Sequence, residues 1–290
     1  MDKDGATHSR VISSRELSQD QQKTRVNGNP EFLPQTSTSG DVNAVKHSSA
    51  PAIISRTPSS AEIHPGVGFR IKRDFARPSG DAAAMFQQFD VADISDHLNR
   101  LYAVDWSIKC LSGGDRRLVG PACTVKVYPG DNLMVHKALD IAKPGDVVIV
   151  DAGGSAENAV LGDTISMKAQ HRGILGFVID GYVRDLPSIR AINYPVYARG
   201  DMPIGPLHRG PGEINYPICC GGVVIAPGDI VVADHAGIVV VPQTCIADLH
   251  GRLLGHKERM SSYLENVRKG QFSNAWVDQL LDGARCRVED

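Results

Sequence analysis

Short apolar runs that alternate with helical spacings constrain the fold of this chain more than any other feature. The runs are rich in valine and isoleucine and are bounded by turn residues, which is typical of buried β-strands. They lie at 119–127, 147–150, 177–179, 223–225, 230–233 and 238–241. Between them, apolar residues recur at helical spacing over 132–141, 163–172 and 186–192. Strands that alternate with helices in this way predict an α/β fold around a buried sheet.

Helical spacing also flanks the predicted sheet on both sides. An amphipathic helix is predicted over about 81–102, where Phe86, Phe89 and Ile94 recur on one side. A long helix is predicted over about 245–269 and a shorter one over 274–281. The long helix carries leucines beside many charges, which favours packing against the core or against another subunit.

The first 65 residues differ sharply in composition from the rest of the chain. They are rich in Ser, Gln, Asn and Thr and show almost no apolar periodicity. Such a segment buries too little apolar surface to offset the entropy lost on ordering. We therefore predict a disordered tail over 1–65 and one folded domain with C-terminal helices over 66–290.

One sequence pattern occurs twice in the domain. The turn at 144–146 (Pro-Gly-Asp) leads into an apolar strand that ends at Asp151, and the same turn at 227–229 leads into a strand that ends at Asp234. Two such units favour a barrel or sandwich with internal pseudo-symmetry. The alternative is that Pro-Gly-Asp turns simply precede strands often.

Composition narrows the classes of function. The net charge of −2 gives no basic excess for binding a phosphate backbone, so nucleic acid is not expected as a ligand. No run approaches the roughly 18 apolar residues of a membrane span, and the N-terminus lacks an apolar signal core. The six cysteines lack framework spacing, which favours reduced thiols in a cytoplasmic protein. The adjacent pair Cys219 and Cys220 is expected to be buried.

The segment 151–185 holds the densest set of chemical groups. It begins where a predicted strand ends, and ligands usually bind at such ends in α/β sheets. Gly162 and Asp163 open a predicted helix, with Asp163 as its N-cap and the amides of Thr164 and Ile165 unpaired. A helix start with free N–H groups binds a carboxylate readily. The plainer interpretation is that Asp163 only caps its helix.

Arg184 and Asp185 follow a strand and a predicted turn at Asp180-Gly181. The planar fork of an arginine matches a carboxylate or an enolate oxygen, and an adjacent aspartate can hold Mg²⁺. A cation beside a guanidinium stabilises a developing enolate. The alternative is an exposed ion pair at a helix start, which contributes little stability.

The spacing of these residues is similar to that of a known family. Asp163, twenty residues and then Arg184-Asp185 form the pattern D-x20-R-D, which resembles the RraA-like family. That family includes 4-hydroxy-4-methyl-2-oxoglutarate (HMG) and 4-carboxy-4-hydroxy-2-oxoadipate (CHA) aldolases. Supporting motifs occur at 120–139, 144–154, 173–185, 194–200 and 222–242, so the likeness covers most of 80–270.

The resemblance implies a compact β-sandwich or barrel flanked by helices, similar to the phosphohistidine swivelling domain. It implies homotrimers or hexamers and a class II pyruvate aldolase that also decarboxylates oxaloacetate. The family's roles then fall on residues 162–165 (Gly162, Asp163, Thr164 and Ile165) for substrate binding, on Arg184 for the pyruvyl group, and on Asp185 for Mg²⁺ or Mn²⁺. In the expected mechanism a pyruvate enolate forms, and Asp163 steers a water that carries the proton.

Two departures from the family pattern affect the expected substrate. Family aldolases usually carry a lysine in a stretch where this chain has Gly205-Pro-Leu-His208-Arg209, so a distal carboxylate is expected to be held differently. A glutamate from the C-terminal helix is also expected at the site, with Glu258 as the nearest candidate.

Other polar residues have plainer interpretations. His136 is expected to be a packed histidine, and His235 to be structural in a tight turn beside Asp234. Two such groups alone are weak evidence for a metal. Lys126 lies in a strand and is expected to point outward, which disfavours imine chemistry.

Two other functions compete with the lyase. RraA-like proteins include ring-shaped regulators that bind an RNase E-like partner without catalysis, although such a ring needs no metal ligand. Methyl transfer is disfavoured, because Asp151-Ala-Gly-Gly154 lacks the glycine pattern of a nucleotide site.

Overall fold

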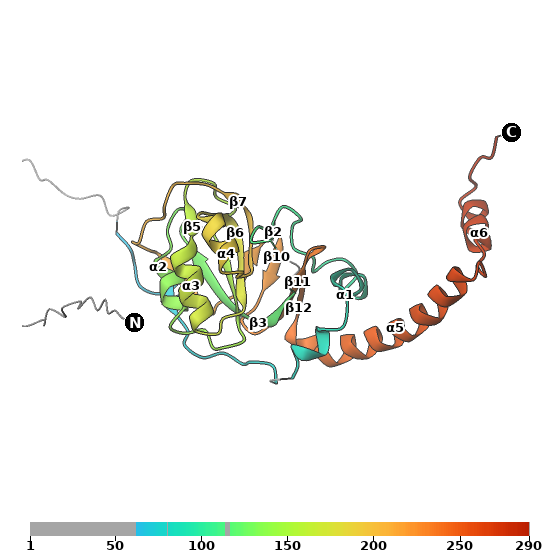
Figure 1. Cartoon of the computed structure of the whole chain (residues 1–290), viewed down its shortest axis with the longest axis horizontal. Coiled ribbons are helices and arrows are strands. Elements are labelled where there is room, and N and C mark those ends of the chain that lie inside the picture. The colour runs from blue at the N-terminus through green and yellow to red at the C-terminus, as the bar shows by residue number, and fades with distance from the viewer. Residues whose placement is uncertain (1–61, 80, 114–116, 290) are drawn as a thin grey trace, which may run out of the picture. The chain divides into compact units, whose positions relative to one another are not determined.

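The computed structural model describes residues 62–79, 81–113 and 117–289 (Figure 1). It has the predicted α/β architecture, with a large mixed sheet flanked by helices. The tail predicted over 1–65 lies outside the described residues except for its last four. The domain predicted to begin at residue 66 opens with a short strand at Phe69–Ile71.

The main sheet has ten strands, seven of which form the path β1-β8-β3-β4-β6-β7-β2. Strand β5 pairs with β6, β11 pairs with both β3 and β12, and β9 and β10 form a separate hairpin. The bounds are β1 (Phe69–Ile71), β2 (Lys109–Cys110), β3 (Leu118–Val127), β4 (Val147–Asp151), β5 (Ala159–Leu161), β6 (Gly176–Val183), β7 (Val196–Asp201), β8 (Gly212–Ile214), β9 (Ile218–Cys220), β10 (Val223–Ile225), β11 (Ile230–Asp234) and β12 (Gly237–Val241).

Strand β3 makes the sheet fold back on itself. Its first residues pair antiparallel with β11, while 122–126 pair in parallel with β4. Strands β4, β6 and β7 continue this parallel order, so their carboxyl ends lie along one edge. The result is a sandwich-like body in which β11 and β12 form a second layer.

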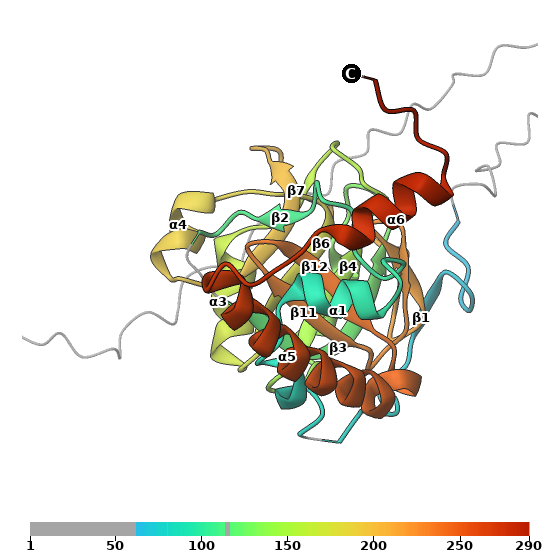
Figure 2. The same cartoon turned by 90° about the vertical axis from the view of Figure 1, so that its right-hand side faces the viewer.

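Helices cover both sides of this body (Figure 2). Their bounds are η2 (Ala84–Phe86), α1 (Val91–His97), α2 (Leu133–Ala138), α3 (Asp163–His171), α4 (Leu186–Ala191), η3 (Gln243–Cys245), α5 (Ile246–Arg268) and α6 (Ala275–Gly283). The single helix predicted over 81–102 is wrong. Asp90 has extended backbone (ψ 148°) and separates η2 from α1, while Asn99 and Arg100 have left-handed φ and end the helical segment.

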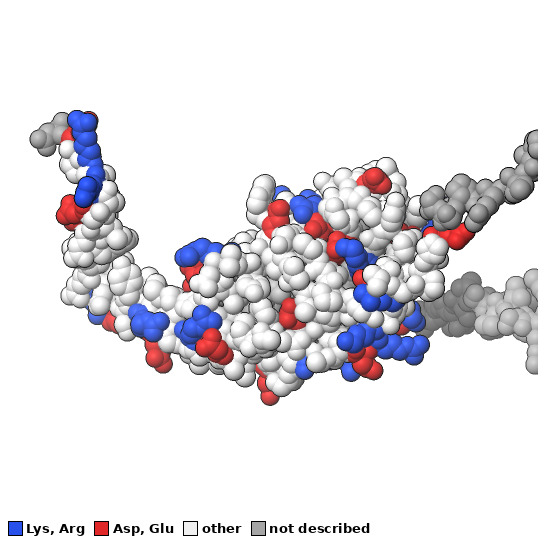
Figure 3. All heavy atoms as spheres, turned by 180° about the vertical axis from the view of Figure 1, so that it is seen from behind, with Lys and Arg blue, Asp and Glu red and all other residues white. Residues whose placement is uncertain are grey.

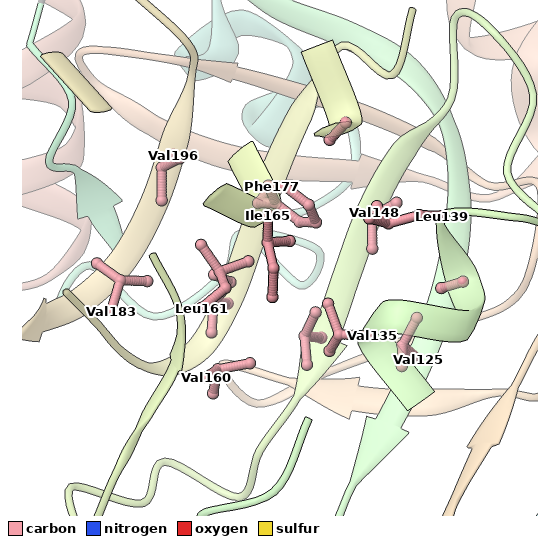
Figure 4. Close-up of a cluster of buried hydrophobic side chains, with 14 of the residues drawn as sticks. Val125, Val135, Leu139, Val148, Val160, Leu161, Ile165, Phe177, Val183 and Val196 are labelled. Atoms are coloured by element: carbon pink, nitrogen blue, oxygen red, sulfur yellow. The ribbon is translucent and has the colours of Figure 1, made fainter. Parts of the chain in front are cut away.

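Three clusters of buried side chains form the core. One lies between the parallel strands and α2, α3 and α4, and includes Leu161, Ile165 and Phe177 (Figure 4). A second fills the space between the two strand layers, and a third joins β11 and β12 to α1 and the start of α5. The first cluster is the one that fixes the start of α3, because both Leu161 and Ile165 are anchored in it.

Strand β6 is longer than predicted. The turn expected at Asp180-Gly181 is wrong, because both residues belong to the strand, with an irregular register between Ile179 and Tyr182. The buried carboxylate of Asp180 accepts hydrogen bonds from Arg199 Nε (2.5 Å) and Gly221 N (2.7 Å). These bonds compensate for its burial and let the strand run on to Val183.

The two Pro-Gly-Asp turns have the same local structure. Gly145 and Gly228 both have φ of 90°, and each aspartate accepts a hydrogen bond of 2.8 Å from the amide three residues before it. The strands that follow differ, since β4 pairs in parallel with its neighbours and β11 antiparallel. The repeat therefore covers the turn and the strand that follows it, but the two strands pair differently with their neighbours.

The surface carries charges of both signs. On the face turned away from the viewer in Figure 1, basic side chains lie beside acidic ones (Figure 3). All six cysteines are free thiols. Cys219 is exposed, contrary to the expectation that both adjacent cysteines are buried, because Ile218 and Cys220 take the inward positions of β9. Among the residues that the structure describes, no helix is both long and apolar enough to cross a bilayer.

Candidate functional site

A cavity of about 400 Å³ lies between the start of α3 and the end of β6. Residues from four separate segments of the chain line it, at 132–136, 161–165, 184–185 and 205–208. These residues are Asn132, His136, Leu161, Gly162, Asp163, Thr164, Ile165, Arg184, Asp185, Gly205, Pro206 and His208. The residues predicted for the site at 162–165 and at 184 and 185 are all among them, whereas the candidate Glu258 is not.

The start of α3 directs backbone amides at this cavity. Gly162, with extended backbone, is the N-cap, and Asp163 is the first helical residue. The prediction that Asp163 caps the helix is wrong, since its carboxylate makes no capping bond and instead accepts from Thr164 Oγ1 (3.1 Å). Ser166 N donates the first hydrogen bond to Gly162 O (3.2 Å). The amides of 163–165 precede that bond, donate no hydrogen bond among the described residues, and can donate to a ligand.

Arg184 and Asp185 lie directly after β6. The amide of Arg184 donates to Leu161 O (3.0 Å), which ties this pair to the residue before Gly162. Asp185 has left-handed backbone (φ 60°) and is the N-cap of α4. A Cβ on Gly162 would lie 2.3 Å from Asp185 Oδ2. Only glycine at 162 therefore allows the two halves of the cavity to come this close.

The guanidinium of Arg184 lacks a full set of partners. Its Nε is buried and lies 3.3 Å from Asp185 Oδ2, but it makes no hydrogen bond within the described part of the chain. A Cβ on Gly205 would lie 2.4 Å from Arg184 Nη1, so glycine at 205 lets the backbone approach the guanidinium. An orphaned buried donor in a cavity favours an anionic ligand that supplies the missing acceptor.

The segment 205–208 lines the cavity beside Arg184. Leu207 N donates to Gly130 O (2.8 Å), and Asn132 N donates to Leu207 O (3.0 Å). The side chain of Asn132 is buried, and its Oδ1 lies 2.6 Å from His208 Nδ1. His208, known from the sequence only as a departure from the lysine pattern, is thus a member of the site.

His136 was also missed, since it was expected to be a packed histidine. It lies one helical turn after Asn132 on α2, half-buried, with its ring edge-on to that of His208 at 5.4 Å between centroids. Burial lowers the pKa of His136, and His208 and Lys168 lower it further. The imidazole is therefore neutral at pH 7. The spacing of four residues from Asn132 to His136 was the available signal.

The donor set at the cavity suits a hard cation held mainly by water. No group of three or more His, Cys, Asp or Glu that could hold a metal exists among residues 62–79, 81–113 and 117–289. Asp185 is exposed at the cavity, and Asp163 lines the same cavity. One or two carboxylates with several waters is the usual arrangement for Mg²⁺, whereas a structural zinc needs four protein ligands.

The other polar candidates lie elsewhere. Lys126 is exposed and pairs with Asp151 (2.7 Å), as its strand position predicts. Asp234 accepts from Ala236 N (2.8 Å) in the turn that also holds His235. Glu258 is exposed on α5 and does not line the cavity of its own chain.

Known proteins resemble this chain. A family model described as "RraA-like: Aldolase/RraA" matches residues 91–240. A protein from Halalkalibacterium halodurans, provisionally named a 4-hydroxy-4-methyl-2-oxoglutarate aldolase, is 43% identical over 163 residues, which cover 56% of this chain and 77% of that protein. A protein of the same provisional name from Shewanella oneidensis is 41% identical over 128 residues, or 44% and 77% of the two chains.

A solved structure resembles the fold. Streptomyces coelicolor RraAS2, described as an unusual member of the RNase ES inhibitor RraA protein family, has a TM-score of 0.61 at 28% identity. The match covers 66% of this chain and 98% of that one.

Proposed function

This chain belongs to the RraA-like family, and on that premise we propose that it is a divalent-metal-dependent carbon–carbon lyase. Its substrate is a short 2-oxo-dicarboxylic acid of the 4-hydroxy-4-methyl-2-oxoglutarate type. One observation carries the proposal: the free amides of 163–165 and the pair Arg184-Asp185 line a single cavity. The provisional aldolase names of relatives at 41–43% identity support the same class of reaction.

The amides and the arginine bind the 2-oxo acid end of the substrate. The amides at the start of α3 donate to the carboxylate, where the helix dipole also favours negative charge. The guanidinium of Arg184 faces the same space with one buried donor unpaired, so it gains an acceptor when the substrate binds. The cost of leaving that donor unpaired in the free protein is recovered in the complex.

Arg184 has its largest effect after the bond breaks. Cleavage of the C3–C4 bond leaves its electron pair on C3, and the pair delocalises onto the 2-oxo oxygen as an enolate. A guanidinium at the cavity stabilises this developing charge more than it stabilises the neutral ketone. Asp185 would hold Mg²⁺ or Mn²⁺, which supplies further positive charge for the enolate oxygen.

The enolate must then be protonated at C3 to give pyruvate. Asp163 lies half-exposed on the cavity wall, and we assign to it the orientation of the water that delivers this proton. Oxaloacetate loses CO₂ through the same pyruvate enolate. One site therefore serves both aldol cleavage and decarboxylation.

The direct test is to supply the full chain with oxaloacetate or 4-hydroxy-4-methyl-2-oxoglutarate in Mg²⁺ and to measure pyruvate. We expect both substrates to yield pyruvate, EDTA to stop the release, and Arg184→Ala to abolish it with unchanged thermal unfolding. Arg190→Ala is the matched control, because Arg190 is exposed on α4 and lies outside the cavity. Full activity in EDTA would remove the metal from the proposal.

The second candidate is a ring that binds and regulates an RNase E-like partner without catalysis. Its support is the structural likeness to a member of an RNase ES inhibitor family. Absence of pyruvate from either substrate, together with inhibition of an RNase E-type enzyme by the purified chain, would favour this candidate over the lyase.

We further propose that the chain works in the cytoplasm as a homotrimer or hexamer, with neither nucleic acid nor membrane as a partner. The mixed charges of the surface in Figure 3 and the free thiols support this setting.

A further inference from the structure

The proton positions on His208 follow from its neighbour. Asn132 is 1% exposed, and its Nδ2 donates to Val160 O (2.8 Å), so the orientation of the amide is fixed. Its Oδ1 then faces His208 Nδ1 at 2.6 Å. A carbonyl oxygen can only accept, so Nδ1 of His208 must carry the hydrogen. In the neutral ring the lone pair is therefore on Nε2.

Within the part of the chain that the structure describes, this lone pair accepts no hydrogen bond. No hydrogen bond to Nε2 of His208 is present there, while the ring lines the cavity shared with Arg184 and Asp185. The backbone that carries the ring is held to Gly130 and Asn132 by the hydrogen bonds of Leu207. The imidazole is thus a positioned acceptor at the binding site, with a solvent-exposed side through which protons can exchange.

We propose that His208 is the base that accepts the C4 hydroxyl proton of the substrate in aldol cleavage. This inference rests on the proposed lyase function and adds a residue for the half of the reaction that Arg184 does not serve. We assign the 2-oxo acid end to Arg184 and the amides. His208 lines the same cavity from a different segment of the chain, so we place the hydroxyl-bearing end of the substrate beside it.

The step is balanced without a further reactant. The O–H bond at C4 breaks as its proton moves to Nε2, and the oxygen's electron pair forms the new C=O bond. The C3–C4 bond breaks and leaves its pair on C3 as the enolate. A proton is added at C3 and the imidazolium returns its proton to solvent, so there is no net change in protons.

His136 is less suited to this task than His208. It has no fixed hydrogen-bond partner that would set its tautomer within the described residues, and its ring lies edge-on to His208. It is neutral at pH 7 because burial lowers its pKa. A neutral His136 does not repel the proton that His208 takes up. His208 can therefore act as the base while His136 packs against it.

The two reactions of the site differ in their need for His208. Oxaloacetate has no hydroxyl at C4, so its decarboxylation needs no base there, whereas aldol cleavage does. General base catalysis typically contributes about 10²–10⁴-fold to a rate. Loss of His208 therefore has a large effect on one substrate and a small effect on the other.

The test compares His208→Gln and His208→Ala with wild type on both substrates in Mg²⁺. We expect kcat for 4-hydroxy-4-methyl-2-oxoglutarate to fall by about 10²-fold or more and oxaloacetate decarboxylation to change by less than about threefold. Added imidazole should restore part of the aldol cleavage in His208→Ala. His171→Gln is the matched control, since His171 is exposed at the far end of α3. Nitrogen NMR of the His208 ring should find the hydrogen on Nδ1.

The outcomes distinguish this inference from the function on which it rests. Wild type that cleaves neither substrate contradicts the lyase itself. Wild type that is active while His208→Gln retains aldol cleavage, or loses both reactions equally, overturns the role of His208 and leaves the lyase intact. A ring hydrogen on Nε2 in the neutral protein also overturns it.

Discussion

Gly162 determines how closely the two halves of the cavity can approach. The missing side chain leaves room for Asp185, whose Oδ2 would lie 2.3 Å from an added Cβ. Asp185 itself is held in left-handed backbone at φ 60°, a conformation that Asp tolerates better than most residues. Backbone strain of this kind persists where the surrounding structure imposes it, and it is often found at functional sites.

Gly162→Ala should therefore impair turnover while the fold survives. The new methyl group has to displace the Asp185 carboxylate and the stem of Arg184, and a displacement of about 1 Å in an active site can cost roughly 10²-fold in rate. Pyruvate release and the Mg²⁺ concentration for half-maximal rate measure the effect. Gly251→Ala in α5 is the control, because its Cβ meets nothing within 4 Å. Wild-type kinetics for Gly162→Ala would show that the Asp185 carboxylate and the Arg184 stem accommodate the methyl group without loss of turnover.

At the residue scale, the sequence predicts those site residues that belong to a spacing pattern along the chain and misses the others. Residues 162–165 and 184–185 are found from a spacing along the chain, and the structure brings them to one cavity. His208 follows from no spacing, because a hydrogen bond across 76 residues of sequence separation brings it to Asn132. Contacts of that range depend on the tertiary fold and leave no local signal.

At the scale of elements, the apolar strands are predicted well and the polar or very short ones are not. The strands at β4, β11 and β12 are buried on both sides, so continuous Val and Ile runs mark them. Strands β5 and β8 have three residues each and draw their stability from pairing with β6 and β3. The prediction of a single helix over 81–102 is wrong because apolar residues keep their helical spacing across Asp90, where the backbone is extended.

The two Pro-Gly-Asp turns offer a matched prediction about backbone strain. Gly145 and Gly228 share a φ of 90°. Alanine at either position should therefore lower the free energy of unfolding by about 1–2 kcal/mol, because its side chain disfavours a left-handed backbone. A Cβ on Gly145 meets nothing within 4 Å, whereas on Gly228 it would lie 2.4 Å from Gln243 Nε2 and 2.6 Å from Ala76 O.

Gly228→Ala should therefore destabilise the protein more than Gly145→Ala, by roughly a further 1–3 kcal/mol for the steric overlap. Urea unfolding followed by circular dichroism measures both free energies of unfolding. Equal losses would show that the neighbours of Gly228 relax freely and that only the backbone conformation matters.

At the scale of the whole molecule, the C-terminal helices carry more apolar surface than the domain itself uses. Helix α5 buries only Leu249 and Leu253, and α6 buries none of its residues. Trp276 and Leu280 on α6 are 60% and 64% exposed. Apolar side chains gathered on an exposed helix are typical of a packing surface between proteins, and the proposed homotrimer or hexamer supplies a second copy to cover them.

Light scattering of the purified chain should thus give three or six times the mass of the 31.2 kDa protomer. Leu280→Asp adds a charge to the exposed apolar face of α6, and burying that charge between subunits without a partner is costly, so the assembly should weaken. Gln279→Asp adds the same charge to a neighbouring polar position and should leave the mass unchanged. An unaltered assembly in Leu280→Asp would exclude α6 from the subunit contact, and a monomeric wild type would contradict the oligomer itself. If the wild type is monomeric, pyruvate release by the same sample reports whether the site is complete within one chain.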